Sequence, residues 1–334
     1  MFFCALHKDS LWEVFGLELI SLYYFSELAK DMHITKTAER LFVTQQTLSN
    51  HIARLENYFG VQLLYRRPKL SLTTAGEFVL AFAGVIEQEH TNLKDILSDI
   101  EQQERGAIRF GASTLRMNTS LPHILPRFSE RYPNVELRLT DTISSKLTPL
   151  VLDGELDFAI VLSSDPDPKL VAHHLMEDHV YLCVADSLLR RCYGEETDAL
   201  KARAEHGASV RDFARLPFCM LNNRMGEQIR SCFAEADVVP RAYMTSTYTQ
   251  IGTNICFERL AAAFIPHACL VDQRGNLPDD VNVFPLLSEG KPLVQDMSLI
   301  RRKDRYLPHF FKFFLDLLFQ YYAEIENIRM DRVV

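Results

Sequence analysis

Beyond residue 106 the sequence alternates short β-prone segments with helical patterns. A strand pattern at 107–113 is followed by a helical pattern that we expect to begin near 119–120, and then by strand, helix and strand patterns over 135–162. Because strand–helix–strand units form parallel sheets covered by helices, this half of the chain predicts an α/β fold. A second alternating series begins near Leu175, and the chain closes with an amphipathic helical pattern.

The part of the chain before this point has helical periodicity. Apolar spacing over residues 17–30 predicts a first helix, and a short second helix follows with Thr35 as its N-cap. Thr44 is placed to cap a third helix, which ends at Gly60, a residue that tolerates the left-handed conformation. Its apolar residues share one stripe: Leu48, Ile52, Leu55 and Phe59. Two short helices that meet at residues 43–44 predict a helix-turn-helix.

Two β-prone segments and a long helix follow. The β-prone segments flank a run of Arg66, Arg67, Pro68 and Lys69, which predicts a hairpin with a basic tip. A helical pattern then continues from Thr74 to about residue 104. An amphipathic helix of this length needs a partner, so we expect it to pair with a second copy of the chain.

The distribution of charge along the chain restricts any nucleic-acid site to a small region. The 334 residues carry a formal net charge of -8, which excludes a generally basic protein. Residues 30–69 hold seven Lys and Arg against three acids, a balance of +4 that leaves about -12 for the rest. A basic island in an acidic chain is typical of a surface that contacts a phosphate backbone.

The third helix has a polar face suited to the edges of base pairs. Opposite its apolar stripe lie Gln46, Asn50, Ala53 and Asn57, with Ser49 and Arg54 on the flanks. Gln and Asn can bond adenine with two hydrogen bonds, and Ser can bond any base. The alternative is an ordinary solvated helix face, which the helix-turn-helix spacing, the basic hairpin and the local charge together disfavour.

The segment 37–77 resembles the winged helix-turn-helix of the LysR-type transcriptional regulators. The matching residues are Ala38, Leu41, Val43, Thr44, Gln45, Leu48, Ser49, Ile52, Leu55, Glu56, Gly60, Leu63, Leu64, Arg66, Leu72, Thr73, Ala75 and Gly76. The sequence departs from the family pattern at Thr37, Gln46 and Asn50, where alanine, proline and a basic residue are common.

The resemblance implies a domain order and a set of DNA contacts. After an extension over 1–16 come the winged helix-turn-helix (17–75), a dimerising linker helix (76–105) and an effector domain (106–334). The effector domain is expected to resemble a periplasmic binding protein, with subdomain I at about 106–172 and 270–334 and subdomain II at about 173–269. The residues expected at double-stranded DNA are Thr35, Thr44, Gln45, Gln46, Ser49 and Asn50 for base edges or the helix ends, and Arg54, Arg66, Arg67 and Lys69 for phosphates or the minor groove.

A small-molecule cleft is expected where the first strand of the effector domain ends. Ser113 and Thr114 offer hydroxyls there, Arg116 offers a cation, and a nearby helix N-terminus favours an anion. The resemblance adds Ser144, Asn222 and Asn223 to the cleft. We therefore expect an effector that is small and anionic. The family's glycine-rich loop is replaced by "ERLAAAFIP" at 258–266, which lacks those glycines.

The sequence offers no catalytic or cofactor motif. It contains no HExxH, GxSxG, GxGxxG or P-loop, and the adjacent His173 and His174 would point to opposite faces of a strand. We expect no enzyme activity, cofactor or metal. The alternative is a small-molecule-binding α/β protein or an enzyme whose helix-turn-helix is degenerate.

The remaining expectations concern the setting of the protein. No stretch is long and apolar enough for a membrane span, the N-terminus lacks a secretory pattern, and the cysteines are scattered, so we expect a cytoplasmic protein. Cys183 and Cys192 have two interpretations. They are either structural thiols, one buried and one in a loop, or a pair that forms a redox switch. Assembly as a dimer of dimers, and contact with RNA polymerase, are implied by the resemblance.

Overall fold

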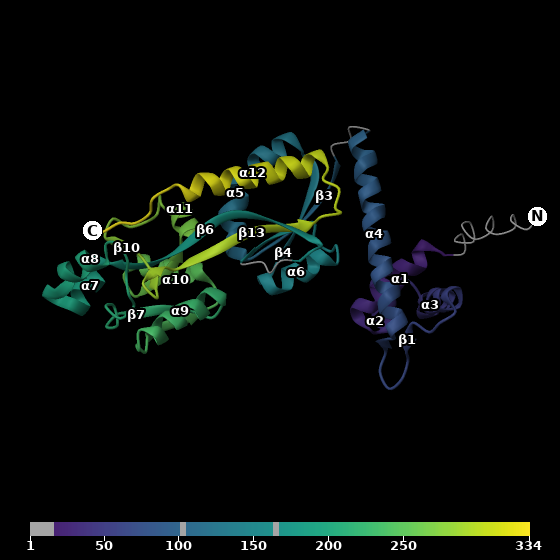
Figure 1. Cartoon of the computed structure of the whole chain (residues 1–334), viewed down its shortest axis with the longest axis horizontal. Coiled ribbons are helices and arrows are strands. Elements are labelled where there is room, and N and C mark those ends of the chain that lie inside the picture. The colour runs from purple at the N-terminus through teal and green to yellow at the C-terminus, as the bar shows by residue number, and fades with distance from the viewer. Residues whose placement is uncertain (1–16, 101–104, 163–166) are drawn as a thin grey trace, which may run out of the picture. The chain divides into compact units, whose positions relative to one another are not determined.

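The computed structural model describes residues 17–100, 105–162 and 167–334, and it divides into two compact units, Met1–Leu97 and Ser98–Val334 (Figure 1). The extension at 1–16 and the predicted end of the linker helix at 101–104 lie outside the described residues. Within those described ranges, no helix is long and apolar enough to cross a membrane.

The first unit is a helix-turn-helix followed by a hairpin. Its elements are α1 (Leu19–Asp31), α2 (Ile34–Arg40), α3 (Gln45–Phe59), β1 (Leu64–Tyr65), β2 (Ser71–Leu72) and the start of α4 (Thr74–Ile100). β1 and β2 pair antiparallel around the basic tip, which confirms the predicted hairpin. The predicted cap of α3 is also confirmed, because the Thr44 hydroxyl accepts a hydrogen bond from the Thr47 amide at 3.0 Å.

The predicted cap of α2 is wrong. The helix begins at Ile34, and the ring of His33 accepts a hydrogen bond from the Lys36 amide at 3.3 Å. Thr35 therefore lies inside the first turn. Thr is generally preferred over His as an N-cap. A ring nitrogen of His can also accept a hydrogen bond, however, and His33 directly precedes the first residue of the helix.

The apolar stripe of α3 is the centre of this unit. Leu48, Ile52 and Leu55 are buried against residues of α1 and of the hairpin. Burying a side chain of this size contributes about 1.5–3 kcal/mol each, so the stripe fixes which face of α3 stays in water. Gly60 ends the helix with a φ of 67°, the left-handed conformation that its sequence position predicts.

Helix α4 keeps an exposed apolar stripe within the first unit. The side chains of Phe78, Phe82, Val85 and Leu93 are exposed, Phe78 by 73%. Such a row on one helix is typical of a surface that pairs with another helix.

The second unit is a mixed sheet covered by helices. The strand order is β4-β3-β5-β13-β6-β9-β7-β8, with β10 also paired to β6. The strands are β3 (Arg105–Ala112), β4 (Asn134–Asp141), β5 (Phe158–Leu162), β6 (Leu170–Ala185), β7 (Pro217–Leu221), β8 (Arg241–Ser246), β9 (Ala262–Pro266), β10 (Val281–Pro285) and β13 (Val294–Arg302). β3 is parallel to β4 and β5, as predicted, whereas β13 and β6 run antiparallel to their neighbours.

Two crossing strands divide the unit into two lobes. Residues 170–179 of β6 pair with β13, whereas residues 180–185 pair with β9 and β10. We call the part around β3, β4 and β5 lobe I, and the part around β7, β8, β9 and β10 lobe II; Figure 1 shows β6 and β13 running between them. The subdomain boundary near residue 270 stays a prediction, and the pairing of β10 favours a boundary nearer Leu293.

Helices cover both lobes. Those of lobe I are α5 (Thr114–Arg131), α6 (Ser144–Leu152) and α12 (His309–Glu326), and those of lobe II are α7 (Asp186–Tyr193), α8 (Thr197–Ala204), α9 (Arg224–Glu235), α10 (Thr249–Phe257) and α11 (His267–Asp272). The expected start of α5 near 119–120 is wrong. The prediction placed Pro122 in the first turn, but the helix contains both Pro122 and Pro126.

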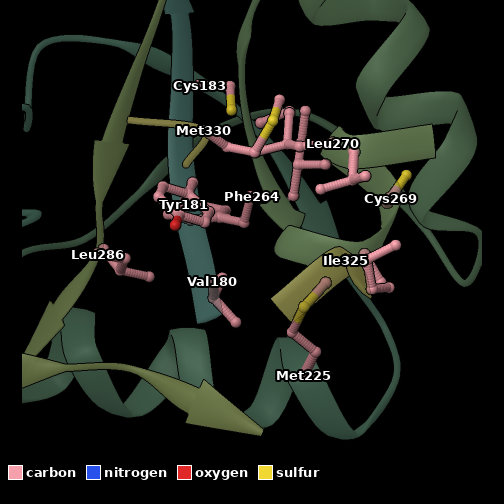
Figure 2. Packing of buried hydrophobic residues seen from close by; sticks show 14 of the residues in the cluster. Val180, Tyr181, Cys183, Met225, Phe264, Cys269, Leu270, Leu286, Ile325 and Met330 are labelled. Carbon is pink, nitrogen blue, oxygen red and sulfur yellow. The ribbon is translucent and has the colours of Figure 1, made fainter. Parts of the chain in front are cut away.

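The core of lobe II holds most of the thiols. Figure 2 shows Cys183 and Cys269 among apolar side chains such as Phe264 and Leu270. Cys183 is fully buried, and this burial raises the pKa of its thiol. Because a buried thiol with a raised pKa is a poor nucleophile, the geometry favours the structural reading of Cys183 over the redox reading.

Candidate functional site

The exposed face of α3 carries amide side chains. Gln45, Gln46 and Asn50 are exposed, and Ser49 is half-buried. The Gln46 amide donates to the Asn50 oxygen at 2.9 Å, one turn along the helix. This bond leaves the Gln46 oxygen and the Asn50 amide group available, which together can satisfy an acceptor and a donor on a base edge.

Most cations of the predicted basic island pair with acids. The pairs are Lys30–Glu27, Lys36–Asp31, Arg40–Glu27, Arg40–Asp31, Arg54–Glu18 and Arg66–Glu56. Glu18 and Glu27 lie outside the 30–69 window, so the sequence count overstated the local excess of positive charge. Only at the hairpin tip are cations left over: among the described residues, Arg67 and Lys69 are exposed and have no acidic partner.

Glu56 connects α3 to the hairpin. Its carboxylate accepts hydrogen bonds from the Leu63 and Leu64 amides at 3.0 and 3.4 Å, and from the Arg66 guanidinium at 3.2 Å. The position of the hairpin tip relative to α3 therefore depends on this side chain. The sequence placed Glu56 in the family pattern without giving it a role, because two of its three partners are backbone amides, which leave no mark in the sequence.

The predicted effector residues surround one cavity of about 790 Å³ in the second unit. Those residues are Ser113, Thr114, Arg116, Ser144, Asn222 and Asn223, and the lining also includes residues not predicted: Leu115, Asn118, Asp141, Thr142, Ile143, Ser145, Lys146, Leu162, Arg224, Met225, Glu227, Thr247, Tyr248, Thr249, Gln250 and Gln295. They come from lobe I, lobe II and a crossing strand, which is the arrangement of a cleft between two lobes. Contact between these residues and a ligand stays a prediction. The segment 258–266 does not line this cavity.

The anion position at the start of α5 is already filled. The Asp141 carboxylate, at the end of β4, accepts hydrogen bonds from the Thr114 amide at 2.8 Å and from the Thr114 hydroxyl. A carboxylate at a helix N-terminus is stabilised by the exposed amides and the helix dipole. The feature that suggested an anionic effector is thus occupied by a residue of the chain.

Arg116 lines the cavity, but its charge is already matched within the chain. It lies in the first turn of α5, is 8% exposed, and its guanidinium donates to Ser113 and Gln295, each at 3.1 Å. It also pairs at 3.6 Å with the carboxylate of Asp178, which is buried in β6. Burial raises the pKa of Asp178, and the nearby charge of Arg116 opposes that rise. The buried Asp178 thus balances the charge that Arg116 brings to the cavity lining.

Other predicted cleft residues also have structural bonds. The Ser144 hydroxyl accepts a hydrogen bond from the Leu162 amide at 3.0 Å. The Asn223 side chain caps α9 by accepting from the Gly226 amide, and it donates to the Thr247 carbonyl, both at 3.0 Å. Asn222 is exposed and, within the described chain, its side chain has no partner.

Gly226 allows α9 to start close to β7. A Cβ at this position would lie 1.9 Å from the Leu221 carbonyl oxygen, so any larger residue would push the helix away from the strand. Because α9 begins at the cleft wall, its close packing sets where Asn223 and Arg224 stand.

No metal site is evident in the described ranges. No group of three or more His, Cys, Asp or Glu side chains there has the proximity to hold an ion. His174 shares a hydrogen bond with Asp296 at 2.9 Å at the surface, a pairing that explains it without a metal.

Family profiles match both units of the chain. The profile described as "Bacterial regulatory helix-turn-helix protein, lysR family" matches residues 19–77, and the one described as "LysR substrate binding domain" matches residues 101–323. Together they cover the elements that carry the polar face of α3 and the cleft.

Curated relatives are regulators of Bacillus subtilis (strain 168). YwbI is 29% identical over 292 residues, 87% of this chain and 92% of the relative. YkuM and YybE are 28% and 30% identical, and this chain spans only 57% and 58% of their lengths. Each is named an HTH-type transcriptional regulator.

Solved structures share the fold at low identity. A full-length single-residue variant of OxyR from Pseudomonas aeruginosa aligns with a TM-score of 0.64 at 20% identity, covering 90% of this chain and 94% of that one. Full-length CbnR in complex with its target DNA aligns with a TM-score of 0.53 at 18% identity, covering 91% and 99%. With both units matched by the family's own profiles, the chain belongs to the LysR family of bacterial helix-turn-helix regulators.

Proposed function

We propose that this protein is a sequence-specific DNA-binding transcription regulator controlled by a small molecule in the cleft of its second unit. The observation that carries the proposal is the exposed amide face of α3, which lies opposite a buried stripe and is followed by a hairpin whose described cations Arg67 and Lys69 have no acidic partner. The family consists of transcriptional regulators rather than enzymes, which favours this function over catalysis.

Base reading is assigned to α3. Gln45, Gln46, Ser49 and Asn50 would enter the major groove, where amide side chains can bond adenine and Ser can bond any base. The start of α3, capped by Thr44, would point backbone amides at a phosphate. Thr35, in the first turn of α2, would lie near the same backbone.

Phosphate contact is assigned first to the hairpin tip. Arg67 and Lys69 are free of acidic partners in the described structure, so they can neutralise phosphates without breaking an ion pair. Arg54 and Arg66 are paired with Glu18 and Glu56, but a guanidinium has five N–H donors and can add a phosphate contact. We expect their share to be smaller.

Control by the effector is assigned to the hinge of the second unit. The cleft is lined from both lobes, and β6 and β13 are the strands that join the lobes. A ligand shifts the balance between an open and a closed arrangement only if it binds one of them better. Ligand contacts from both lobes at once would supply that difference.

Assembly is assigned to α4. Its exposed row of apolar side chains supports pairing with a second copy, and a dimer of dimers would place several α3 helices on one DNA. A regulator of chromosomal genes would act in the cytoplasm, where it could contact RNA polymerase.

A fluorescence-anisotropy titration tests the proposal. The full-length protein would be titrated against labelled DNA from upstream of its own gene and against a scrambled duplex, over a series of salt concentrations. We expect tighter binding to the native duplex and an affinity that falls steeply with salt. Equal binding to both duplexes, or none, would favour the alternative, a ligand-binding protein whose helix-turn-helix no longer reads DNA.

A further inference from the structure

Four charged side chains line the cleft without an oppositely charged partner among the described residues: Asp141, Lys146, Arg224 and Glu227. Asp141 ends β4 and Lys146 belongs to α6, both in lobe I. Arg224 and Glu227 stand in the first turn of α9 in lobe II. Each lobe thus presents one acid and one cation to the same cavity.

The rest of the cleft adds no net charge. The charge of the lining residue Arg116 is matched by the buried Asp178, and the remaining lining is neutral. The two acids and two cations sum to zero. A ligand with a single charge would leave the occupied cleft with a net charge, whereas a ligand with one positive and one negative group keeps it neutral, because the remaining Lys146 and Glu227 are opposite in sign. The described cleft is therefore complementary to a zwitterion, a molecule with one positive and one negative group and no net charge.

Resting on the function proposed above, we propose that the effector is a zwitterionic α-amino acid whose ammonium group is bound by Asp141 and whose carboxylate is bound by Arg224. A zwitterionic effector takes the place of the anionic one expected from the sequence. The reason is that the helix terminus and the arginine that suggested an anion are both occupied by acidic residues of the chain.

Asp141 is prepared to receive an ammonium group. The Thr114 amide and hydroxyl hold its carboxylate in place, yet neither neutralises its charge. An ionised carboxylate has about four acceptor positions, so acceptor positions remain for a ligand. A ligand carboxylate at the same place would meet a like charge, which excludes an anion there.

Arg224 is prepared to receive a carboxylate. One of its terminal nitrogens donates to the Leu162 carbonyl of lobe I at 2.9 Å, which holds the guanidinium across the cleft. Its other N–H donors are available for the forked contact that guanidinium groups make with carboxylates. Ile143, Met225 and Tyr248 line the same cavity and provide apolar surface for a side chain.

The contacts with Asp141 and Arg224 would also make the ligand bind the closed arrangement of the lobes more tightly than the open one. Asp141 belongs to lobe I and Arg224 to lobe II, so an amino acid that binds both joins the lobes. A molecule that lacks either charged group would contact one lobe and would have less preference for a closed arrangement.

Isothermal titration calorimetry of the full-length protein tests this assignment. The common L-amino acids would be titrated one by one, and the tightest binder would be compared with its carboxamide and with the matching acid that lacks the amino group. We expect each truncated analogue to bind about 10- to 100-fold more weakly, the loss of one charge-assisted hydrogen-bonded contact. The proposal is overturned if no amino acid binds, or if the acid without the amino group binds equally well.

Substitutions test the two assigned groups separately. Asp141→Asn keeps an oxygen for the Thr114 amide but removes the charge, and Arg224→Gln removes the fork; each should weaken the amino acid about 10- to 100-fold. Asp153→Asn, an exposed acid of lobe I outside the cavity, is the matched control and should change nothing. Circular dichroism and thermal unfolding would confirm that each variant is folded. Unchanged binding in the folded Asp141→Asn variant would refute the ammonium site.

DNA binding, measured on the same preparations without ligand, separates this inference from the function it rests on. Preference for the native duplex with no amino-acid binding would overturn the amino-acid assignment alone. Amino-acid binding with no DNA preference would support the site and overturn the regulator function.

Discussion

The face of α3 and the cleft of the second unit are both polar, but their polar groups are arranged differently along the sequence. On α3 the amide residues follow one another within a single helix, and each points outward because its neighbours in the apolar stripe point inward. In the cleft, Thr114 donates hydrogen bonds to Asp141, 27 residues later in the sequence, and Arg116 forms an ion pair with Asp178, which is still more distant in the sequence. Helical spacing determines the first surface, whereas only the folded sheet determines which groups of the second are neutralised.

Breaking the buried Arg116–Asp178 pair should reduce the stability of the second unit strongly. Arg116→Met leaves the Asp178 carboxylate buried without its cation, and removing one partner of a buried ion pair typically costs about 3–5 kcal/mol. Urea unfolding followed by circular dichroism measures the free energy of unfolding. The matched control is Arg54→Gln at the exposed pair with Glu18, for which little or no change is expected because solvent screens the pair. Equal effects at both sites would contradict the contrast between the two regions.

The second effect concerns base reading by α3. Asn50→Ala removes an amide from the exposed face and should cost about 1–3 kcal/mol of binding to the native duplex, with relaxed preference at one base pair. Anisotropy against a set of duplexes that differ at single positions measures this. A uniform loss on all duplexes would assign Asn50 to the backbone instead.

The third effect concerns the hairpin tip. Arg67→Ala should weaken binding to native and scrambled DNA alike and lower the slope of log affinity against log salt by about one. Arg66→Ala is the matched control, because Arg66 is already paired with Glu56, and its change in slope should be smaller. If both variants change the slope equally, the pairing seen in the free protein does not persist on DNA.

The smallest effect is a pH dependence in the first unit. Hydrogen bonds from Arg40 and Lys36 lower the pKa of Asp31 to about 2. Since the folded pKa lies below the ordinary value of 3.8, the stabilisation is fully present above pH 4 or so and is lost as the pH falls through about 2. A chemical-shift titration of the Asp31 carboxyl measures the pKa. In an Arg40→Gln variant the midpoint should move upward, and an unmoved midpoint would show that Arg40 is not the cause.

Several features of the fold were predictable because their signals are local. Alternation of strand and helix patterns predicted the α/β unit, Thr44 and Gly60 predicted the ends of α3, and the flanked basic run predicted the hairpin. The failures were local too. His33 took the cap expected at Thr35, and α5 began ahead of two prolines, because a cap or a proline is compatible with more than one helix start.

The cleft was predictable as a place but not as a chemical environment. Strand ends and the family resemblance indicated Ser113, Thr114 and Asn222, and all of them line the cavity. Nothing near Thr114 in the sequence indicates Asp141, and nothing near Arg116 indicates Asp178, since each partner arrives on a different strand. The count of basic residues on the first unit failed for the same reason, because Arg54 of α3 pairs with Glu18 at the start of α1.

Spacing within a few turns or strands was enough to predict the order of elements, the inward and outward faces of α3, the basic hairpin tip and the positions of the strand ends. Which charges remain free depends on how the chain folds in three dimensions. Electrostatic pairing acts over a few ångströms in space, without regard to separation along the chain. Folding therefore neutralised Arg116, filled the start of α5 with Asp141, and left Arg67 and Lys69 among the described cations free of acids.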